Sequence, residues 1–135
     1  MNIRPISWQE TIPLRHRVLW PDKDPEYCLV EGEEDARHFG AFRSGELVAV
    51  ASVFPTDRGP QLRKFATVAE YQGQGIGSAL MIHIIEEIKR LDVPCFWCDA
   101  RESAQGFYER FGMKVEGKRF YKYNIPHIRL SLSLK

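Results

Sequence analysis

The sequence predicts an α/β fold in which a single mixed β-sheet is flanked by helices. A strand, a helix and a second strand follow one another between residues 62 and 100, and such a crossover makes its two strands parallel neighbours. A β-hairpin is predicted before this unit, and two further strands after it. The 135-residue chain contains no repeat, low-complexity segment or domain boundary, so residues 1–135 are expected to form one domain.

The chain begins with a predicted strand at residues 2–6, which leads into a helix. Ser7 and Glu10 have the spacing of a capping box, in which each side chain accepts a hydrogen bond from the other residue's backbone N–H. Pro13 is also compatible with the first turn of a helix, so a helix that starts nearer Thr11 fits the sequence equally well. Both starting points remain open at this stage.

A loop and a hairpin come next. Residues 21–35 are acidic, poorly periodic and contain two prolines, which predicts a loop with a helical turn. Its carboxylates either form a wall that attracts a cationic amine substrate or belong to a solvated connection. The runs 36–42 and 47–54 alternate as strands do, and the Arg-Ser-Gly sequence at 43–45 is a turn signal between them.

The centre of the chain is a strand, a glycine loop and a helix. The strand-like run 62–68 leads into a short loop with Gly73, Gly75 and Gly77. The helix after it has apolar residues at helical spacing, namely Leu80, Met81, Ile84, Ile85, Ile88 and Leu91. The first turn of a helix presents unpaired N–H groups and partial positive charge, and glycines let a phosphate approach the main chain. We therefore predict that a phosphate-bearing ligand binds residues 73–78.

Spacing distinguishes this loop from two other phosphate-binding loops. No glycine is followed by Lys and a hydroxyl residue as a Walker loop requires, which argues against nucleoside triphosphate hydrolysis. The dinucleotide fingerprint GxGxxG would place its third glycine at Ser78, and no acidic residue follows on a second strand at the usual distance.

The last third of the chain is predicted as a strand, a short helix and two more strands. Residues 93–100 have the apolar character of a largely buried strand. Residues 101–111 form a short helix that Gly112 ends in a left-handed conformation. The final two strands are expected at 112–120 and 127–134, with a loop at 121–126 between them.

Composition limits the partners and the compartment. The chain is 44% hydrophobic with a net charge of +1, so there is no general electrostatic case for a nucleic acid or membrane partner. No apolar run approaches the length of a membrane span, and the amino terminus lacks the apolar core of a signal peptide. We expect a cytoplasmic protein.

Of the three cysteines, Cys28, Cys95 and Cys98, the last two are predicted to be buried structural thiols. An odd number without disulfide-framework spacing argues against a disulfide scaffold. Cys95 and Cys98 form a CxxC pair, but they lie in a strand-like run where residues three apart point to opposite faces. No second Cys or His pair completes a zinc site, so no metal is expected.

Two motifs resemble those of the GNAT acetyltransferases. The loop at residues 72–77 (QGQGIG) resembles the family's (Gln/Arg)-x-x-Gly-x-(Gly/Ala) pyrophosphate loop. Residues 104–113 (AQGFYERFGM) look like its A-x-x-FY-x-x-x-G(F/M) segment, and the two motifs occur in the family's order and spacing. Residues 125–127 (IPH) are similar to the final strand of a bacterial branch of the family. The resemblance covers residues 40–134 well and the preceding residues loosely.

The resemblance implies the GNAT fold, a mostly antiparallel sheet of about six or seven strands with a central parallel pair and about four helices. It also implies acetyl-CoA as acyl donor, bound between the fourth and fifth strands without a metal, and an amine acceptor of unknown identity. Dimerisation is expected from the family alone. Arg101 stands where the family often has Asn, so it either meets a CoA phosphate or is a solvated charge. The residues assigned to acetyl-CoA are Phe65, Ala66, Thr67, Gln72, Gly73, Gln74, Gly75, Ile76, Gly77, Ser78, Arg101, Ala104, Phe107 and Tyr108.

The mechanism that the resemblance implies is direct attack of the amine on the thioester carbonyl. Tyr108 matches the family's tyrosine that protonates the departing thiolate, although it could instead simply pack its helix against the sheet. The carboxylate base that many relatives carry on the fourth strand is missing from residues 62–68. The remaining candidates for the general base are His127, Asp99, Glu70 and His38. A water relay, or an amine that binds already neutral, is the alternative to a side-chain base.

Two functions follow from these motifs. The first is an N-acetyltransferase that acts on a primary amine of a small molecule or a peptide. The second is a regulatory protein that binds acyl-CoA without turnover. Both require the phosphate-binding loop, and only the first requires an acid, a base and an acceptor site.

Overall fold

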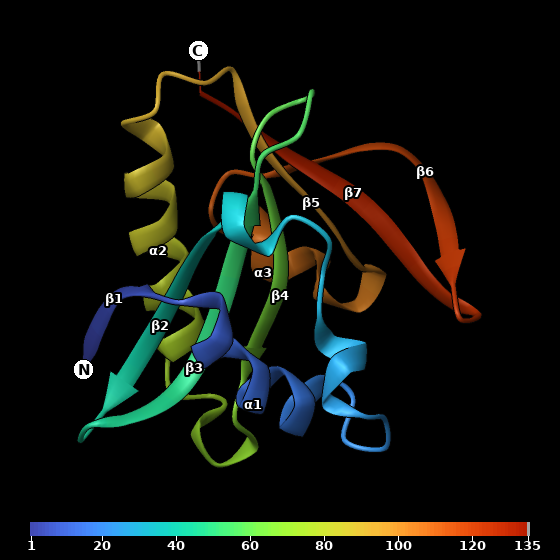
Figure 1. The fold of residues 1–135 in the computed structure, drawn as a ribbon. Coiled ribbons are helices and arrows are strands. Elements are labelled where there is room, and N and C mark those ends of the chain that lie inside the picture. Colours follow the sequence, from blue (N-terminus) through green and yellow to red (C-terminus); the bar gives the residue numbers. More distant parts are fainter. Residues whose placement is uncertain (135) are drawn as a thin grey trace.

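The computed structural model describes residues 1–134, which form one seven-stranded sheet in the order β1-β2-β3-β4-β5-β7-β6 (Figure 1). The elements are β1 (Asn2–Ile6), α1 (Trp8–Leu19), β2 (Arg37–Arg43), β3 (Glu46–Phe54), β4 (Gln61–Thr67), α2 (Ile76–Lys89), β5 (Cys95–Arg101), α3 (Gln105–Glu109), β6 (Lys114–Lys122) and β7 (Ile125–Ser133). Only β4 and β5 pair in parallel among the described strands. The predicted fold class is confirmed, with three α-helices and four short 3-10 turns in residues 1–134 in place of about four helices.

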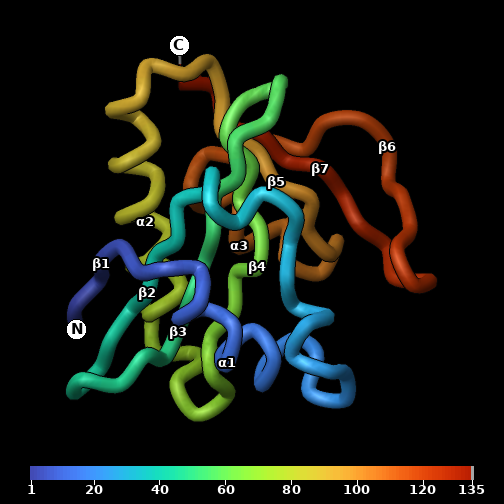
Figure 2. Tube along the Cα trace, viewed as in Figure 1, coloured from blue at the N-terminus to red at the C-terminus, as the bar shows by residue number. Residues whose placement is uncertain are grey.

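The helices cover both faces of the sheet. On one face α1 packs Leu14 against Val50, Ala66 and Val68 of the sheet and the segment after β4. On the other face α2 and α3 cover the larger core, to which α2 contributes Ile76, Leu80, Met81, Ile84, Ile85 and Ile88. These are the positions that the helical spacing predicted, apart from Leu91, which lies beyond the helix and is half-buried. Figure 2 shows the β6–β7 hairpin extending away from the other elements.

Helix α1 begins at Trp8, which decides between the two predicted starting points. The Ser7 amide donates to Glu10 Oε1 at 2.9 Å, and the Glu10 amide donates to Ser7 Oγ at 3.2 Å. These reciprocal bonds satisfy two donors that would otherwise be unpaired at the start of the helix. Pro13 consequently lies inside the helix and not in its first turn.

Several element boundaries differ from the prediction. Strand β5 starts at Cys95 and extends to Arg101, and the predicted helix 101–111 is divided into a 3-10 turn (Glu102–Ala104) and α3. The loop expected at 121–126 is only a two-residue turn, because Tyr123 and Asn124 both have positive φ, of 52° and 64°. A turn with two such residues matches the twist of the strands it joins, so β6 and β7 continue up to it.

The parallel strands β4 and β5 separate almost at once. Their register contains only two pairs, Gln61 with Trp97 and Leu62 with Cys98. On its other side β4 pairs with β3, where Val50 faces Ala66 but Ser52 faces Arg63. Strand β4 therefore has one extra residue over this interval, which is a β-bulge.

The bulge explains why the strands separate. Lys64 lies within it and has a φ of +56°, a left-handed conformation that is uncommon for a residue with a side chain. A bulge bends its strand and increases the local twist. The bend follows directly after Leu62, the last residue of β4 paired with β5, so the β5-facing edge of residues 63–67 has no strand partner among the described residues.

A buried ion pair fixes the loop between α1 and β2 to the sheet. Arg15 is fully buried, and its Nη1 lies 2.6 Å from Glu33 Oε2 while its Nη2 donates to Ser52 Oγ at 2.9 Å. Burial alone would raise the pKa of Glu33, but hydrogen bonds from Arg15 and the Val30 amide lower that pKa below its ordinary value. Residues 21–35 contain two 3-10 turns, Pro25–Cys28 and Glu33–Asp35, and this ion pair connects them to β3.

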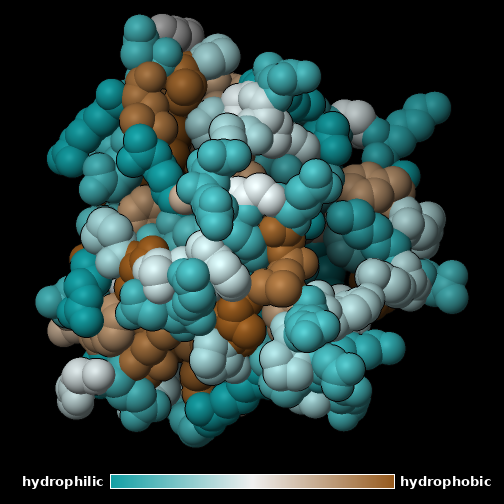
Figure 3. Space-filling view, viewed as in Figure 1, coloured by the Kyte–Doolittle hydropathy of each residue, from teal (hydrophilic) through white to brown (hydrophobic). Residues whose placement is uncertain are grey.

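One face of the molecule is largely hydrophilic. Figure 3 shows hydrophilic residues over most of the visible face, with apolar patches between them. No helix within residues 1–134 is both long enough and apolar enough to span a membrane.

Replacement of Arg15 by Leu should destabilise the fold strongly. The change leaves the Glu33 carboxylate buried without its partner, and breaking a buried pair in this way costs about 3 kcal/mol or more. Chemical denaturation followed by circular dichroism measures the change. The matched control is Arg17→Leu in the same helix, which breaks an exposed pair with Glu70 and should leave the midpoint close to that of the wild type. Equal effects of the two variants would contradict a special role for Arg15.

Candidate functional site

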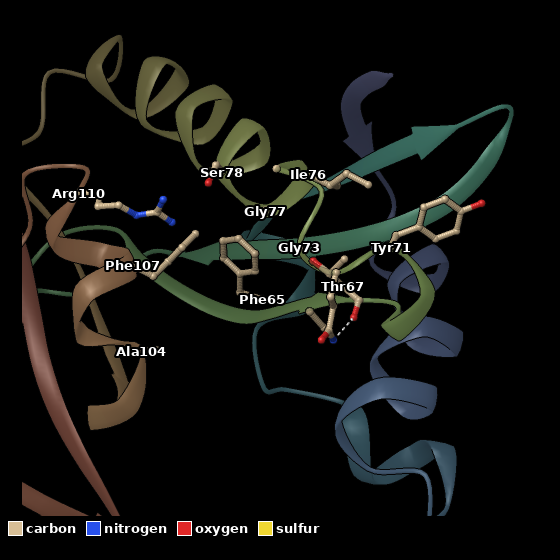
Figure 4. A pocket seen from close by; sticks show the side chains of 13 residues that line it. Phe65, Thr67, Tyr71, Gly73, Ile76, Gly77, Ser78, Ala104, Phe107 and Arg110 are labelled. Carbon is tan, nitrogen blue, oxygen red and sulfur yellow. Dashed lines mark hydrogen bonds between the residues drawn. The ribbon is translucent and has the colours of Figure 1, made fainter.

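The first cavity lies between β4, the glycine loop and α3, and its volume is about 660 Å³. We refer to it as the loop cavity (Figure 4). Figure 4 shows Phe65 and Phe107 next to each other in its lining, and their rings pack edge to face with centroids 5.8 Å apart. Its lining residues are Phe65, Ala66, Thr67, Tyr71, Gln72, Gly73, Gly75, Ile76, Gly77, Ser78, Ala104, Phe107 and Arg110.

The glycine loop presents backbone N–H groups to this cavity. Gly73 and Gly75 have φ angles of +76° and +81°, which residues with side chains rarely adopt. Gly75 precedes the first residue of α2, and the first amide bonded back along the helix is that of Ala79, which donates to the Gly75 carbonyl at 3.0 Å. The amides of residues 76–78 therefore have no partner within the helix, and the helix dipole adds positive potential there. This arrangement suits a phosphate group.

Side chains hold the loop in this shape. Gln72 Nε2 donates to the Thr67 carbonyl at 3.0 Å, and Gln74 Nε2 donates to the Glu70 carbonyl at 3.2 Å. Gln74 also accepts a hydrogen bond of 2.8 Å from Arg43. Gln74, one of the predicted cofactor residues, is absent from the cavity lining and is engaged in holding the loop.

Two further cavities adjoin each other beyond the β4–β5 gap. The inner cavity measures about 310 Å³ and includes Phe65, which also lines the loop cavity. The outer cavity measures about 520 Å³ and shares Trp20, Arg63, Lys64, Arg101 and His127 with the inner one. The other residues of the inner cavity are Leu19, Leu62, Phe65, Cys98, Asp99 and Tyr108. Phe65 therefore lies between the loop cavity and the inner cavity.

Tyr108 lines the inner cavity and is well placed to donate a hydrogen bond. Its hydroxyl has no hydrogen-bond partner among residues 1–134, and its ring packs edge-on against Phe107 with centroids 5.1 Å apart. Burial, followed by the electrostatic effect of the nearby Cys98, raises the pKa of Tyr108 far above its ordinary value. The phenol therefore stays protonated, although a raised pKa also makes complete proton transfer to a thiolate more costly than it is for an exposed tyrosine.

Two of the four predicted base candidates also line the inner cavity. Asp99 is held by Arg129 through two hydrogen bonds, at 2.7 and 3.0 Å. His127 Nδ1 lies 2.9 Å from the Ile125 carbonyl, and an N–H donated there leaves Nε2 as the acceptor. His127 therefore has an available nitrogen, whereas the Asp99 carboxylate is committed to an ion pair.

The other two candidates lie elsewhere. His38 is buried in the Arg15 network, where Nδ1 is 2.7 Å from Ser52 Oγ and Nε2 is 2.9 Å from the Glu33 carbonyl. Glu70 is exposed and pairs with Arg17 at 2.7 Å. Neither residue lines the loop, inner or outer cavity.

Most of the predicted cofactor residues line the loop cavity; Gln74, Arg101 and Tyr108 do not. Arg101 lines the inner and outer cavities, and Arg110 provides the cation at the loop cavity instead. Sequence reasoning missed Arg110, although its position two residues after Tyr108, directly at the end of α3, was a usable signal. It also missed Trp20 and Lys64, because only the fold brings them to the gap.

None of the carboxylates in residues 21–35 lines these three cavities. Glu33, the one buried acid of that segment, is the partner of Arg15. In the structure the segment thus supplies no acidic wall to the gap, and its solvated-connection interpretation agrees with the geometry.

The sequence matches the Acetyltransferase (GNAT) domain family over residues 23–134. The chain belongs to the GNAT acetyltransferase family. Acetyl transfer is therefore its family-level activity, and the predicted resemblance is confirmed. In this GNAT domain, the glycine loop and the gap between β4 and β5 form the candidate site for acetyl transfer.

Individual relatives agree with this assignment. The chain is 31% identical to an uncharacterised N-acetyltransferase, YitI, of Bacillus subtilis, over 95% of this chain and 90% of that protein. It is 29% identical to the [ribosomal protein bS18]-alanine N-acetyltransferase of Escherichia coli K12, over 72% and 66% of the two chains. The fold is similar to the crystal structure of the Escherichia coli ribosomal-protein-S18-alanine N-acetyltransferase, with a TM-score of 0.82, 20% identity and 98% and 93% coverage. An aminoglycoside 6'-N-acetyltransferase crystallised with coenzyme A has a TM-score of 0.80 at 16% identity, with 100% and 98% coverage.

Two of the three cysteines of this GNAT domain are buried, and the third is not. Cys28 and Cys98 are 1% and 2% exposed, and burial, with the charge of Asp99, raises the pKa of Cys98 to about 12. Cys95 is only half-buried, which corrects the prediction, because it lies at the start of β5 with its thiol against the Arg58 carbonyl.

Alkylation should distinguish these thiols. Iodoacetamide at pH 8 should label Cys95 first in the native protein, since the buried thiols are inaccessible and the pKa of Cys98 disfavours its thiolate. Mass spectrometry of peptides after timed quenching measures the order. The same reaction in guanidinium chloride is the control, in which all three should react at similar rates. Native labelling of Cys98 as fast as Cys95 would show that the gap is more open than described.

Proposed function

We propose that the protein transfers the acetyl group of acetyl-CoA directly to a primary amine, within a complex that holds both substrates. The observation that carries this proposal is that Phe65, beside the β4–β5 gap, lines both the loop cavity and the inner cavity. Two cavities that meet at one side chain would let donor and acceptor approach the same point from different sides. Direct transfer then requires no covalent enzyme intermediate, and holding both reactants in place supplies much of the catalysis.

The donor would occupy the loop cavity. Its pyrophosphate would accept hydrogen bonds from the free amides at the start of α2, with Arg110 nearby. Its pantetheine arm would lie along the unpaired edge of β4 at residues 63–67 and exchange main-chain hydrogen bonds with it, as an added strand does. The acyl end would then reach the gap beside Phe65.

The acceptor would enter through the outer cavity and react in the inner one. Tyr108 would donate a hydrogen bond to the sulfur of the departing CoA as negative charge develops there. His127 Nε2 would accept the proton of the attacking amine, either directly or through a water molecule. Asp99 would keep Arg129 in place and would not act as the base.

The printed names of relatives support an amine acceptor. The Escherichia coli relative is named for acetylation of an alanine of ribosomal protein bS18, and one similar structure is an aminoglycoside acetyltransferase with coenzyme A. These acceptors differ greatly in size and chemistry. The family therefore supports the reaction type, and the acceptor has to be inferred from this chain's own residues.

Acetyl-CoA should raise the thermal midpoint, and Gly75→Glu should abolish the rise. At a hundredfold excess over the dissociation constant the ligand stabilises the native state by roughly 2.7 kcal/mol, a shift that differential scanning fluorimetry detects. A glutamate at Gly75 would place a carboxylate against the pyrophosphate. Gly117→Glu is the matched control, because Gly117 also has positive φ and open space around it but lies on β6. If both variants keep the full rise, the loop does not bind the donor.

Tyr108→Phe should lower kcat by about a hundredfold while the affinity for acetyl-CoA stays within twofold. The change removes only the hydroxyl that would stabilise the departing thiolate, and the ring remains in its contact with Phe107. Release of free CoA thiol measures turnover, and calorimetry measures donor affinity. Tyr121→Phe is the control, since Tyr121 is exposed and lines none of the three cavities. An unchanged kcat in Tyr108→Phe would leave this tyrosine with a packing role only.

A further inference from the structure

Four cations surround the inner and outer cavities. Arg63 and Lys64 come from β4, Arg101 from the end of β5 and Lys122 from the end of β6. The two cavities share the first three of these residues, and Lys122 lines the outer cavity. Segments far apart in the sequence therefore bring positive charge to one place.

These four side chains have no anionic partner. Within residues 1–134 none of them forms an ion pair, whereas Arg58, Arg119 and Arg129 are paired with Glu116, Glu102 and Asp99. Asp99 is the one carboxylate among the residues lining the two cavities, and Arg129 already neutralises it. The cavities therefore have unneutralised positive charge in a protein whose net charge is only +1.

Lys64 is the most constrained member of the group. It is half-buried within the bulge of β4, and burial lowers its pKa, with further lowering from the charges of Arg63, Arg15 and Lys122. Its backbone has a φ of +56°, a left-handed conformation that is strained for a residue with a side chain. A cation kept in a strained conformation beside other cations is stabilised when an anion binds between them.

We infer that the acceptor is an amine that also carries an anionic oxyacid group, either a carboxylate or a phosphate, which these four cations bind. This inference rests on the proposed function, because it identifies the acceptor of that reaction. With the anionic group among Arg63, Lys64, Arg101 and Lys122, the amine lies toward Tyr108 and His127 in the inner cavity. Polyamines and other acceptors without an anionic group are repelled by the same charges.

The positive charge also assists the chemistry. The attacking amine must be neutral, and nearby cations favour the neutral form of an amine over its ammonium. The anionic group retains the substrate while the amine gives up its proton. Binding and activation of one small zwitterion thus use the same four side chains.

The first experiment measures anion binding without turnover. With CoA present at saturation to occupy the loop cavity, sodium phosphate and sodium acetate are compared with sodium chloride at equal ionic strength by scanning fluorimetry. Phosphate or acetate should raise the midpoint by about 3 °C more than chloride does. The rise should be lost in Lys122→Glu and kept in Lys114→Glu, which reverses an exposed charge on the same strand outside these cavities. The stronger of the two anions identifies which oxyacid the site prefers.

The second experiment measures acceptor preference. Thiol release from acetyl-CoA is followed with matched pairs: 4-aminobutanoate and 1,4-diaminobutane, glycine and glycinamide, O-phosphoethanolamine and ethanolamine. The anionic member of a pair should have a kcat/KM at least about tenfold higher. Lys122→Glu should raise the KM for the anionic acceptor about tenfold and leave the KM for acetyl-CoA unchanged. Lys114→Glu should change neither KM.

The outcomes separate the inference from the proposed function. If CoA raises the midpoint but neither anion exceeds chloride, the inference is wrong while the donor site stands. The inferred anionic acceptor is also wrong if the enzyme prefers the diamine, or if Lys122→Glu raises the KM for acetyl-CoA. If both members of every pair fail to release thiol, the proposed acetyl transfer fails and the acceptor class fails with it.

Discussion

The separation of β4 from β5 is the constraint on which the rest of the site depends. A sheet that paired these strands along their whole length would have no free edge and no passage between its faces. The extra residue at Lys64 bends β4 after only two parallel pairs, while β5 stays paired with β7 along its whole length. The bulge stores strain in one residue and leaves main-chain hydrogen-bonding groups open to a ligand.

The two sides of the gap present positive potential by different means. On the side of α2, the amides at the start of the helix and the glycine conformations form a site made largely of backbone, which suits a phosphate common to every donor molecule. On the other side, positive charge comes from long side chains at the ends of strands. Because side chains change without altering the fold, the acceptor side is the part that can differ between relatives with similar backbones.

The features that the sequence predicted correctly are those set by short sequence patterns, and the features that it missed have no such pattern. The glycine loop, α2, the first hairpin and the parallel crossover each depend on spacing within a short window, and all were found in the structure. The bulge at Lys64 has no such signal, since a lysine gives no indication of positive φ. The position of Arg101 at the acceptor side, with Arg110 at the loop cavity, also depends on where β5 ends and α3 begins, and those boundaries were predicted incorrectly.

The net charge of the sequence also could not predict where unpaired charges lie in the fold. A total of +1 predicts no general attraction to polyanions, but it averages over charges that are paired and charges that are not. Glu102, Glu116 and Asp99 neutralise three arginines near the β6–β7 hairpin, which leaves the cations around the gap without partners. The inferred acceptor site depends on those unpaired charges, and net charge could not predict it because only the fold shows which acid lies beside which base.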